Sequence, residues 1–418
     1  MNEKADIVVV GGGPCGSFSA LTAAKLGLEV VVCEEHREIG VPTHCSGHVS
    51  LRGLERLELR LPQKIVENEI KGAVFYSPLG EEFGVRFASP VSLVVNREAL
   101  DKHLSDLAVK AGVRYLLESR AESFLLDSGS ITGVTVRRRG VKETLGAHVV
   151  IDAEGCSSVL LKRAGLQTLD RSMVVNAVHA EVDRVGEISA DTVEVYLGRK
   201  FAPGLFAWII PKRDSSAKVG LATRRGDPLA HLRRFMRSHP IASKKLSKSK
   251  ITRLSLHPIP LGGPVPKTYS NGLLIVGDAA SQVKPTTGGG IVFGLLCSKM
   301  AGEVAYQGVK NRDYSENSLS RYQSRWKKAA GFDMMVMRRA RKLLNHLTDE
   351  KIDKIIKLCA KLGIDKSLEE VRDLDFQGKL LIRLIRHPAM SIAALYFLLS
   401  SLTSPESLPS SGLDWIIS

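Results

Sequence analysis

DIVVVGGGPCGSFSALTAAKLGLEVVVCEE, residues 6–35, is the stretch of sequence that decides the fold. Its first apolar run, at 7–10, predicts a strand, and the apolar periodicity of 17–26 predicts a helix. A second run of β-branched residues at 30–33 predicts another strand. A strand, a helix and a strand in this order form a βαβ unit, the usual beginning of an α/β fold.

Three glycines between the first strand and the helix have the spacing of a dinucleotide-binding fingerprint. Gly11 permits the tight turn, Gly13 lets the backbone approach a pyrophosphate, and Gly16 lets the helix pack against the sheet. The helix N-terminus then offers unpaired N–H groups to the phosphates. Glu34 follows at about the spacing of the acid that binds ribose hydroxyls. The fingerprint predicts a dinucleotide cofactor without distinguishing NAD from FAD.

A distant segment decides between the two cofactors. NGLLIVGDAASQVKPTTGGGIVFGLLCSKMAGEVA, residues 271–305, contains a buried strand, a Gly-Asp turn and a glycine cluster that opens a helix. In this arrangement Asp278 can hold ribityl hydroxyls, while the N–H groups of Gly290 and Ile291 face a flavin ring. Those N–H groups would stabilise negative charge on the reduced isoalloxazine. The predicted cofactor is therefore FAD.

Composition limits the class of protein and its location. The chain has 418 residues, 44% of them hydrophobic and 25% charged, as expected for a globular protein of more than one domain. Its six cysteines form no C-x-x-C pair, so neither a metal site nor a disulfide framework is predicted. No secretory h-region precedes the first glycine loop, which predicts a cytoplasmic protein.

The formal net charge of +15 predicts attraction to a polyanion. Lipid headgroups, a phosphorylated substrate and an acidic protein all remain open, whereas nucleic acid ranks last because no aromatic residues or zinc spacing accompany the basic run. That run, 244–250, is more typical of a solvated loop than of a membrane contact. The apolar run 389–402 is too short to span a bilayer, and predicts either a packed helix or a peripheral contact beside Arg383 and Arg386.

The order of the predicted elements indicates an α/β chain with an interrupted first domain. Short β-branched runs predict an antiparallel sheet inserted into the Rossmann-like domain, and the chain becomes helical after the second glycine cluster. The predicted FAD-binding domain comprises 1–65, 96–170 and 265–310. The predicted substrate domain comprises 66–95 and 171–264, and a helical region covers 311–418.

Together these motifs resemble the flavoproteins that include aromatic hydroxylases, halogenases and geranylgeranyl reductases. The resemblance covers residues 6–305. It implies that Arg97, in VNREALDKHL, reaches the cofactor and that the backbone at Ala121 contacts the adenine side. VVIDAEGCSS resembles the D-G motif of the group, with Glu154 in place of the usual aspartate. The residues expected at the cofactor are Gly11, Gly13, Cys15, Gly16, Glu34, Cys45, Ser46, Arg97, Ala121, Asp278, Gly290 and Ile291.

Two segments resemble the geranylgeranyl reductase branch. VPTHCSGHVS is similar to the cysteine-containing loop beside the flavin, although Ser46-Gly47-His48 departs from the commoner small-Glu-Gly continuation. LFAWIIPKRDSSAKVGLA is similar to a Y-x-W-x-F-P and G-x-G signature, with Phe206 in the tyrosine position and Ala222 in the last glycine position. Trp208 and Phe206 are expected to wall a lipid tunnel.

The resemblance implies reduction of isolated C=C bonds in geranylgeranyl chains of archaeal-type lipid precursors. Hydride from the flavin must be matched by a proton, for which Cys45 and His44 are the candidate catalytic donors and His48 is a third. The electron donor is expected to be a carrier such as ferredoxin or NAD(P)H. Two alternatives remain open: a flavin monooxygenase of an aromatic or isoprenoid compound, and a flavoprotein that passes electrons to quinone.

Overall fold

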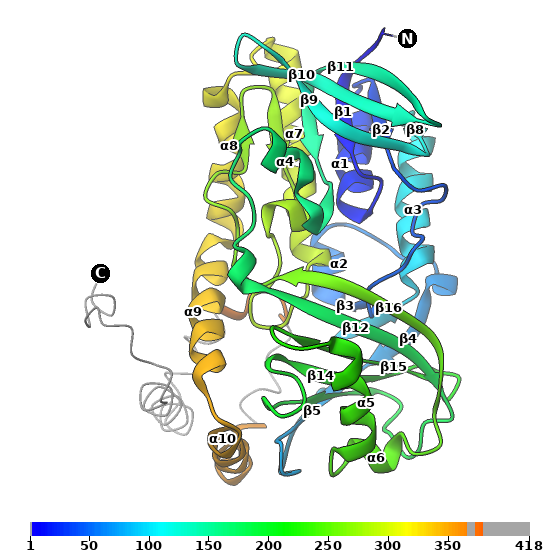
Figure 1. Ribbon diagram of the computed structural model, residues 1–418, viewed down its shortest axis with the longest axis vertical. Coiled ribbons are helices and arrows are strands. Elements are labelled where there is room, and N and C mark those ends of the chain that lie inside the picture. Colours follow the sequence, from blue (N-terminus) through cyan, green and yellow to red (C-terminus); the bar gives the residue numbers. More distant parts are fainter. Residues whose placement is uncertain (1, 366–372, 379–418) are drawn as a thin grey trace, which may run out of the picture.

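The computed structural model describes residues 2–365 and 373–378 (Figure 1). The predicted α/β fold, with a Rossmann-type domain, a second sheet and C-terminal helices, is confirmed. Figure 1 shows one large sheet above the other, with a column of helices running down one side of both. The space between the two sheets is where the candidate site lies.

The upper sheet is built around the first strand of the sequence. β1 (Asn2–Val10) pairs in parallel with β2 (Val30–Cys33) on one side and with β11 (Val141–Asp152) on the other. The order β18, β11, β1, β2, β8 is parallel throughout, and β17 pairs antiparallel with β18 at one edge. Antiparallel strands β9 and β10 extend from β11. The remaining bounds in this sheet are Arg114–Leu116 (β8), Ser119–Asp127 (β9), Ser130–Arg138 (β10), Tyr269–Ser270 (β17) and Leu273–Ile275 (β18).

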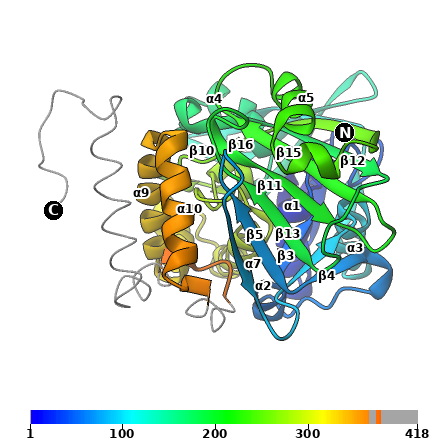
Figure 2. The same ribbon diagram turned by 90° about the horizontal axis from the view of Figure 1, so that it is seen from below.

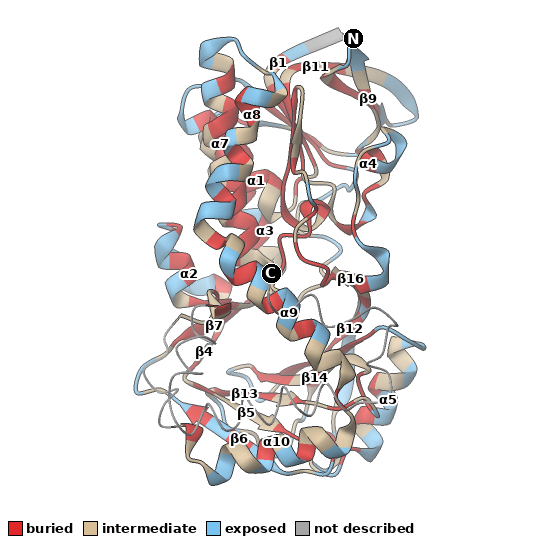
Figure 3. Cartoon of the chain, turned by 90° about the vertical axis from the view of Figure 1, so that its left-hand side faces the viewer, coloured by how far each residue is buried: buried red, intermediate tan, exposed pale blue. Residues whose placement is uncertain are grey.

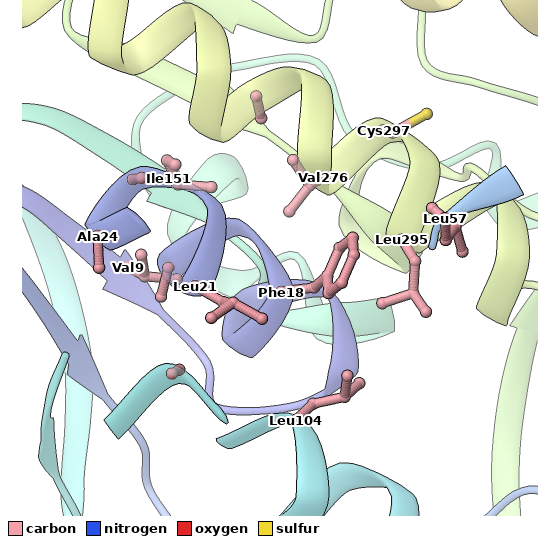
Figure 4. Close-up of a cluster of buried hydrophobic side chains, with 14 of the residues drawn as sticks. Val9, Phe18, Leu21, Ala24, Leu57, Leu104, Ile151, Val276, Leu295 and Cys297 are labelled. Carbon is pink, nitrogen blue, oxygen red and sulfur yellow. The ribbon is translucent and has the colours of Figure 1, made fainter. Parts of the chain in front are cut away.

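Three helices cover one face of this sheet and form its core. α1 (Pro14–Lys25) lies between α3 (Arg97–Lys110) and α7 (Ile291–Asn311), and packs against both. Figure 4 shows Phe18 and Leu21 of α1 among apolar side chains from the sheet, α3 and α7. A Cβ at Gly302 would lie 2.7 Å from the Ser19 carbonyl oxygen, so α7 approaches the backbone of α1 closely. The packing joins segments almost 300 residues apart.

The lower sheet has seven strands in the order β16, β12, β15, β14, β13, β5, β6. It is antiparallel, as expected, except that β13 and β5 are parallel. A parallel pair needs a long connection rather than a hairpin, and more than 110 residues separate these two strands. The bounds are Gly72–Tyr76 (β5), Glu82–Arg86 (β6), Val174–Asp183 (β12), Thr192–Tyr196 (β13), Gly204–Pro211 (β14), Ala217–Thr223 (β15) and Lys250–Pro260 (β16).

Successive side chains along each strand of the lower sheet point to opposite faces of that sheet. On β12, Val178 and Ala180 pack under α5 (Pro228–Ser238), whereas Ala177 and His179 face the upper domain and line a cavity. α6 (Ala242–Lys245) completes the outer cover. The predicted solvated loop at 244–250 is therefore wrong in part, because Lys245 belongs to this helix and its ammonium is paired with the buried carboxylate of Glu194.

A small third sheet connects the two large ones. β3 (His48–Ser50), β7 (Ser92–Val95) and β4 (Val66–Ile70) form it. The segment 66–95 is thus divided, with its outer strands here and β5 and β6 in the lower sheet. α2 (Leu51–Arg56) follows β3 and ends beside α7. Figure 3 shows buried residues concentrated in the strands and on the inner sides of the helices.

The helical C-terminal region begins with α8 (Glu316–Trp326) and continues through a π-helical turn, Lys327–Gly331, into α9 (Phe332–His346). α10 (Asp349–Lys361) then packs across β6. Figure 2 shows α10 beside α9, and Figure 3 shows it beside β6. Within the described ranges, no helix is both long and apolar enough to cross a bilayer. The apolar run 389–402, with Arg383 and Arg386, lies outside the described residues.

Candidate functional site

A cavity of about 950 Å³ lies between the two large sheets. Its walls come from the glycine loop after β1, the loop 40–48, the segment 276–292, the inner face of the lower sheet, and α9 and α10. Cavities of this size hold whole cofactors or substrates. The site is described below from its upper, polar end to its lower, apolar end.

The first glycine loop presents an open helix N-terminus to the cavity. Gly11 has a φ of +93°, and a Cβ there would lie 2.5 Å from the Ala153 carbonyl oxygen. Gly13 is the N-cap of α1 and makes no side-chain cap, while a Cβ on it would have no atom within 4 Å. A Cβ at Gly16 would lie only 1.8 Å from the Gly11 carbonyl oxygen. The glycines therefore leave a cradle over uncapped N–H groups, which suits a phosphate.

Glu34, directly after β2, closes the outer side of this cradle. One carboxylate oxygen accepts a hydrogen bond from the Gly12 N–H at 2.7 Å. The other accepts from the His36 N–H at 2.9 Å and lies 2.6 Å from His36 Nδ1. The carboxylate is nearly buried and lines the cavity, so it is held in place to accept hydrogen bonds from a ribose.

The second motif meets the first at Cys15. A Cβ at Gly277 would lie 2.8 Å, and one at Gly294 2.5 Å, from the Cys15 sulfur, so this side chain fills the space that two glycines leave. Burial, followed by the charge of Asp278, raises the pKa of Cys15 to about 12, which keeps the thiol neutral. Cys15 therefore joins α1 to the second motif, and it also borders the cavity.

Asp278 and the N-terminus of α7 form the next part of the wall. A Cβ at Gly290 would lie 3.1 Å from the Val283 Cγ2 and 3.3 Å from an Asp278 carboxylate oxygen, so a side chain there would crowd the carboxylate. Gly290 is the N-cap of α7 and, like Gly13, makes no side-chain cap, which leaves the N–H groups that begin at Ile291 facing the cavity. Asp278 and these donors lie on one wall, as ribityl and flavin ring contacts require.

The loop 40–48 places Cys45 and His44 opposite that wall. The Cys45 sulfur accepts a hydrogen bond from the Gly47 N–H at 3.4 Å and contacts the Arg97 guanidinium. Arg97, at the first turn of α3, is held by Asp101 at 2.9 Å. Ser46 also lines the cavity. The thiol and a buried cation therefore lie side by side.

His44 is stacked on a histidine that the sequence reading did not include. Its ring lies 5.1 Å from that of His257 on β16, with planes 9° apart, and its Nδ1 has no partner among the described residues. Burial, and next the charge of His257, lowers the pKa of His44. His44 lines the cavity, while its unpartnered Nδ1 is itself buried.

The third candidate donor, His48, also lines the cavity, but its ring is hydrogen-bonded to another side chain. Its Nε2 lies 2.7 Å from the Ser92 hydroxyl, and burial lowers its pKa to about 4. His179 on β12 is 5% exposed, has an unpartnered Nδ1, and has its pKa lowered to about 3 by burial. Both imidazoles are neutral at pH 7, which makes them poor acids.

Ala121 and Glu154 were both singled out from the family motifs, but only Ala121 has no other role in the fold that would occupy it. Ala121 on β9 lines the cavity near Glu34, as a contact on the adenine side requires. Glu154 caps α4 (Val159–Arg163), accepting hydrogen bonds from the N–H groups of Val159 at 2.7 Å and Leu160 at 3.1 Å. Its carboxylate is thus engaged in a helix cap, and the substitution of the usual aspartate has a local structural explanation.

The lower half of the cavity is apolar. Trp208 and Phe206 on β14 both line it, with ring centroids 6.1 Å apart. A Cβ at Gly220 on β15 would lie 2.4 Å from the Trp208 ring, so the indole lies directly on that glycine. The other apolar lining residues come from β5, β13 and α10 and include Phe75, Val193, Val195, Ile352, Ile355 and Ile356.

The structure adds several residues that the sequence reading missed. Two of them are Cys156 and His257, whose ligand atoms lie within 4.8 Å of each other and of those of the predicted Asp278, although no metal site is predicted. We assign no metal there, because Asp278 belongs to the cofactor cradle. Cys156 closes the D-G motif and could have been singled out for that reason, whereas His257 has no sequence signal. Lys284 stands in the second motif itself, between its two glycine groups.

The residues present fit FAD. Two uncapped helix N-termini, at Gly13 and Gly290, open into one cavity, and each has an acid beside it, Glu34 and Asp278 respectively. A pyrophosphate, a ribose, a ribityl chain and a flavin ring need this set of groups.

Comparison with known proteins agrees with this geometry. A family model described as an FAD binding domain matches residues 4–295. The chain is 35% identical over 354 residues to digeranylgeranylglycerophospholipid reductase 2 of Methanopyrus kandleri, covering 83% of this chain and 88% of that one. It is 33% identical over 356 residues to the digeranylgeranylglycerophospholipid reductase of Methanocaldococcus jannaschii, covering 84% and 90%.

Solved structures are similar over most of the chain. A geranylgeranyl bacteriochlorophyll reductase-like protein from Thermoplasma acidophilum superposes with a TM-score of 0.82 at 28% identity, covering 91% of this chain and 99% of that one. A flavin-dependent brominase has a TM-score of 0.72 at 17% identity, covering 95% and 98%, and shares the fold alone. FAD is the cofactor that these matches indicate.

Proposed function

Because the chain belongs to the FAD-binding family of digeranylgeranylglycerophospholipid reductases, we propose that it reduces the isolated C=C bonds of geranylgeranyl chains on a glycerophospholipid. One observation carries the proposal: a single cavity joins the dinucleotide cradle to the apolar inner face of the lower sheet. An extended isoprenoid chain is apolar, flexible and longer than a flavin ring. The wall around Phe75, Trp208 and Ile352 offers such a chain an apolar path to the cofactor.

Reduction of an isolated C=C bond requires an acid in a site from which water is excluded. Reduced FAD supplies a hydride to one alkene carbon, and a proton must reach the other carbon because no neighbouring carbonyl absorbs the charge. In this proposal the Cys45 thiol gives its proton to the alkene carbon, and the Arg97 guanidinium beside it stabilises the thiolate that remains after transfer. His44, the neighbouring residue on the same loop, lines the cavity, and its neutral imidazole can relay a proton to the thiolate without storing one. We therefore assign Cys45 as the donor and His44 as its supply.

The test is a single-turnover experiment without oxygen. The purified FAD-loaded protein is reduced with dithionite and mixed with a digeranylgeranylglycerophospholipid, and flavin reoxidation is followed together with lipid mass. Reoxidation with a gain of two hydrogens per double bond supports the reductase. A flavin that stays reduced until oxygen enters, followed by a hydroxylated product, would show that the protein is a monooxygenase instead. Reoxidation by quinone alone would show that it is an electron carrier.

Variants in the same experiment test the donor. Cys45→Ala should slow reoxidation by lipid about 100-fold or more, the usual size of a general-acid contribution, while reduction by dithionite is unchanged. Cys45→Ser, the matched control for side-chain volume, should be slow as well, because an alcohol is a weaker acid than a thiol. If Cys45→Ala reacts at the wild-type rate, the assignment fails and His44→Gln becomes the informative variant.

Exposed basic residues suggest where the lipid substrate and the electron donor approach the protein. Exposed Arg233, Arg234 and Arg237 on α5 lie in the same domain as Lys244 and Lys248. We propose that this region meets the anionic inner face of a membrane, and that an acidic carrier such as ferredoxin is steered by the net charge of +15. Binding to anionic but not zwitterionic vesicles, weakening as salt rises, is the expected result; binding that salt does not change would exclude it.

A further inference from the structure

A short segment far from both glycine motifs forms part of the cavity wall. Leu374, Asp375 and Gln377, from the described stretch 373–378, line the cavity beside the loop 284–290. Phe376 packs on Phe293 of α7, with ring centroids 5.2 Å apart. A Cβ at Gly378 would lie 2.6 Å from the Asp333 Cα, so the stretch also lies close against α9. It is thus enclosed from several sides.

Asp375 is the centre of this contact. It is 1% exposed, and one carboxylate oxygen lies 2.8 Å from the Lys284 Nζ. The other accepts a hydrogen bond from the Ser50 hydroxyl, which in turn caps α2 through the Gly53 N–H at 2.9 Å. Burial alone would raise the pKa of Asp375, but the charge of Lys284 and the hydrogen bonds lower it overall. The carboxylate is therefore ionised, and it binds both Lys284 and Ser50.

Lys284 lies on the loop that faces the proposed flavin position. Its backbone N–H donates to the Gly289 carbonyl at 3.1 Å, and a Cβ at Gly289 would lie 2.7 Å from the Lys284 Cε and 3.2 Å from its Nζ. The side chain therefore folds back over the glycines next to Gly290. Arg341 of α9 holds the same loop from the other side, donating to the Pro285 carbonyl at 2.9 Å.

We propose that Asp375 is a positioning residue that holds Lys284 over the glycine loop, balances its charge, and thereby sets the reduction potential of the bound flavin. This inference rests on the proposed function in one respect, the location of the flavin ring beside Gly288–Ile291. Asp375 acts on the flavin only through Lys284.

The direction of the effect follows from charge. Reduction of a flavin adds negative charge to its ring, which a nearby cation stabilises and a nearby anion destabilises. With Asp375 in place the Lys284 ammonium is compensated at 2.8 Å. Without the carboxylate, an uncompensated cation stabilises the reduced flavin, raises its midpoint potential and weakens it as a hydride donor to an isolated alkene. By compensating the charge of Lys284, Asp375 therefore keeps the midpoint potential of the flavin low, which favours hydride transfer to an isolated alkene.

The experiment measures midpoint potentials of the FAD-loaded protein by anaerobic dye-equilibrated titration. Asp375→Asn should shift the potential upward and slow reoxidation by lipid. Lys284→Met should shift the potential downward, and the double variant should return close to the wild-type potential because both charges are gone. Asp373→Asn is the matched control: it removes a charge that pairs with the partly exposed Arg56 at 3.0 Å, while the asparagine Oδ1 can still accept the hydrogen bond that the Asp375 N–H makes at 3.2 Å. Its potential should equal that of the wild type.

Each outcome has one meaning. Potentials that are equal in wild type, Asp375→Asn and Lys284→Met overturn the inference, as does a double variant that behaves like Asp375→Asn. If Asp375→Asn binds no FAD, Lys284→Met and the double variant still measure the same charge effect. Failure of the proposed function is recognised separately, because a protein that does not act on lipid still has a flavin whose potential these substitutions shift.

Discussion

Gly11 and Gly13 stand two residues apart in one loop but are glycines for different reasons. At Gly11 the positive φ and the Ala153 carbonyl exclude a side chain whether or not a cofactor is bound. At Gly13 the backbone is ordinary and the space is open. Only a bound molecule would meet a Cβ there, so at Gly13 the requirement for glycine belongs to the ligand.

This difference gives a prediction. Gly13→Ala should destabilise the apoprotein by no more than about 1 kcal/mol, the cost of an alanine at a helix N-cap, and weaken FAD binding at least tenfold, because a methyl group enters the space of the pyrophosphate. Gly11→Ala should destabilise the apoprotein by about 1–3 kcal/mol through strain and overlap. Calorimetry of both apoproteins and titration with FAD check this. A Gly13→Ala protein that binds FAD as tightly as wild type would place the pyrophosphate elsewhere.

Single residues also show what a sequence can and cannot reveal. Gly11, Asp278 and Gly290 were readable because their spacing relative to strands and helices is fixed by the cofactor. His257 and Asp375 were not, since each reaches the cavity through pairing or packing with segments distant in the chain. Glu154 was recognised as a departure from the motif, and its role as a helix cap needed the position of α4.

At the scale of elements, α10 closes the apolar half of the cavity. Ile352, Ile355 and Ile356 line it from one face of this helix, while Lys354 is exposed on the other. The amphipathic pattern of 351–362 is typical of a helix packed on an apolar surface, but it does not indicate which surface. That surface is β6, which pairs with β5 at the edge of the lower sheet, and β5 and this helix both line the cavity.

Ile352→Phe should therefore change the preferred chain length. The larger ring shortens the apolar path, so kcat/KM for a geranylgeranyl lipid should fall about tenfold relative to a farnesyl analogue, the usual effect of adding a small group to a hydrophobic pocket. Lys354→Ala, on the exposed face of the same helix, should leave the ratio unchanged. Equal losses for both lipids in Ile352→Phe would mean that the chain does not extend to α10.

At the scale of the whole molecule, buried neutral histidines make stability depend on pH. Burial lowers the pKa of His239 to about 4 and that of His179 to about 3, against an ordinary value near 6.5. His239 is fully buried, and its Nδ1 accepts hydrogen bonds from the N–H groups of Ile241 and Ala242 at 3.3 Å, which requires an unprotonated nitrogen. Between pH 6.5 and 4 the unfolded chain binds protons that the folded chain does not.

Stability should accordingly rise with pH through this window and be lost as pH falls from 6.5 towards 4. His239→Asn keeps an acceptor but removes the proton site, so its unfolding free energy should depend on pH less steeply, by up to about 1.4 kcal/mol per pH unit. Above pH 7 the two curves should run parallel. Denaturant titrations across pH 4–8 measure this, with the less buried His231→Asn of α5 as control; equal slopes in all three proteins would contradict it.

The arrangement of Cys15 between Gly277 and Gly294 has a consequence for how the chain is made. The first fingerprint leaves the ribosome early, yet the helix that covers α1 begins only at Ile291. At about 5–20 residues per second, roughly 15 to 60 seconds pass before that covering helix is synthesised. During this interval Phe18 and Leu21 have no partner from α7, and the flavin wall at Gly290 does not yet exist. We therefore expect FAD to bind only after α7 has been synthesised, which a comparison of FAD binding by chains ending before and after this helix would check.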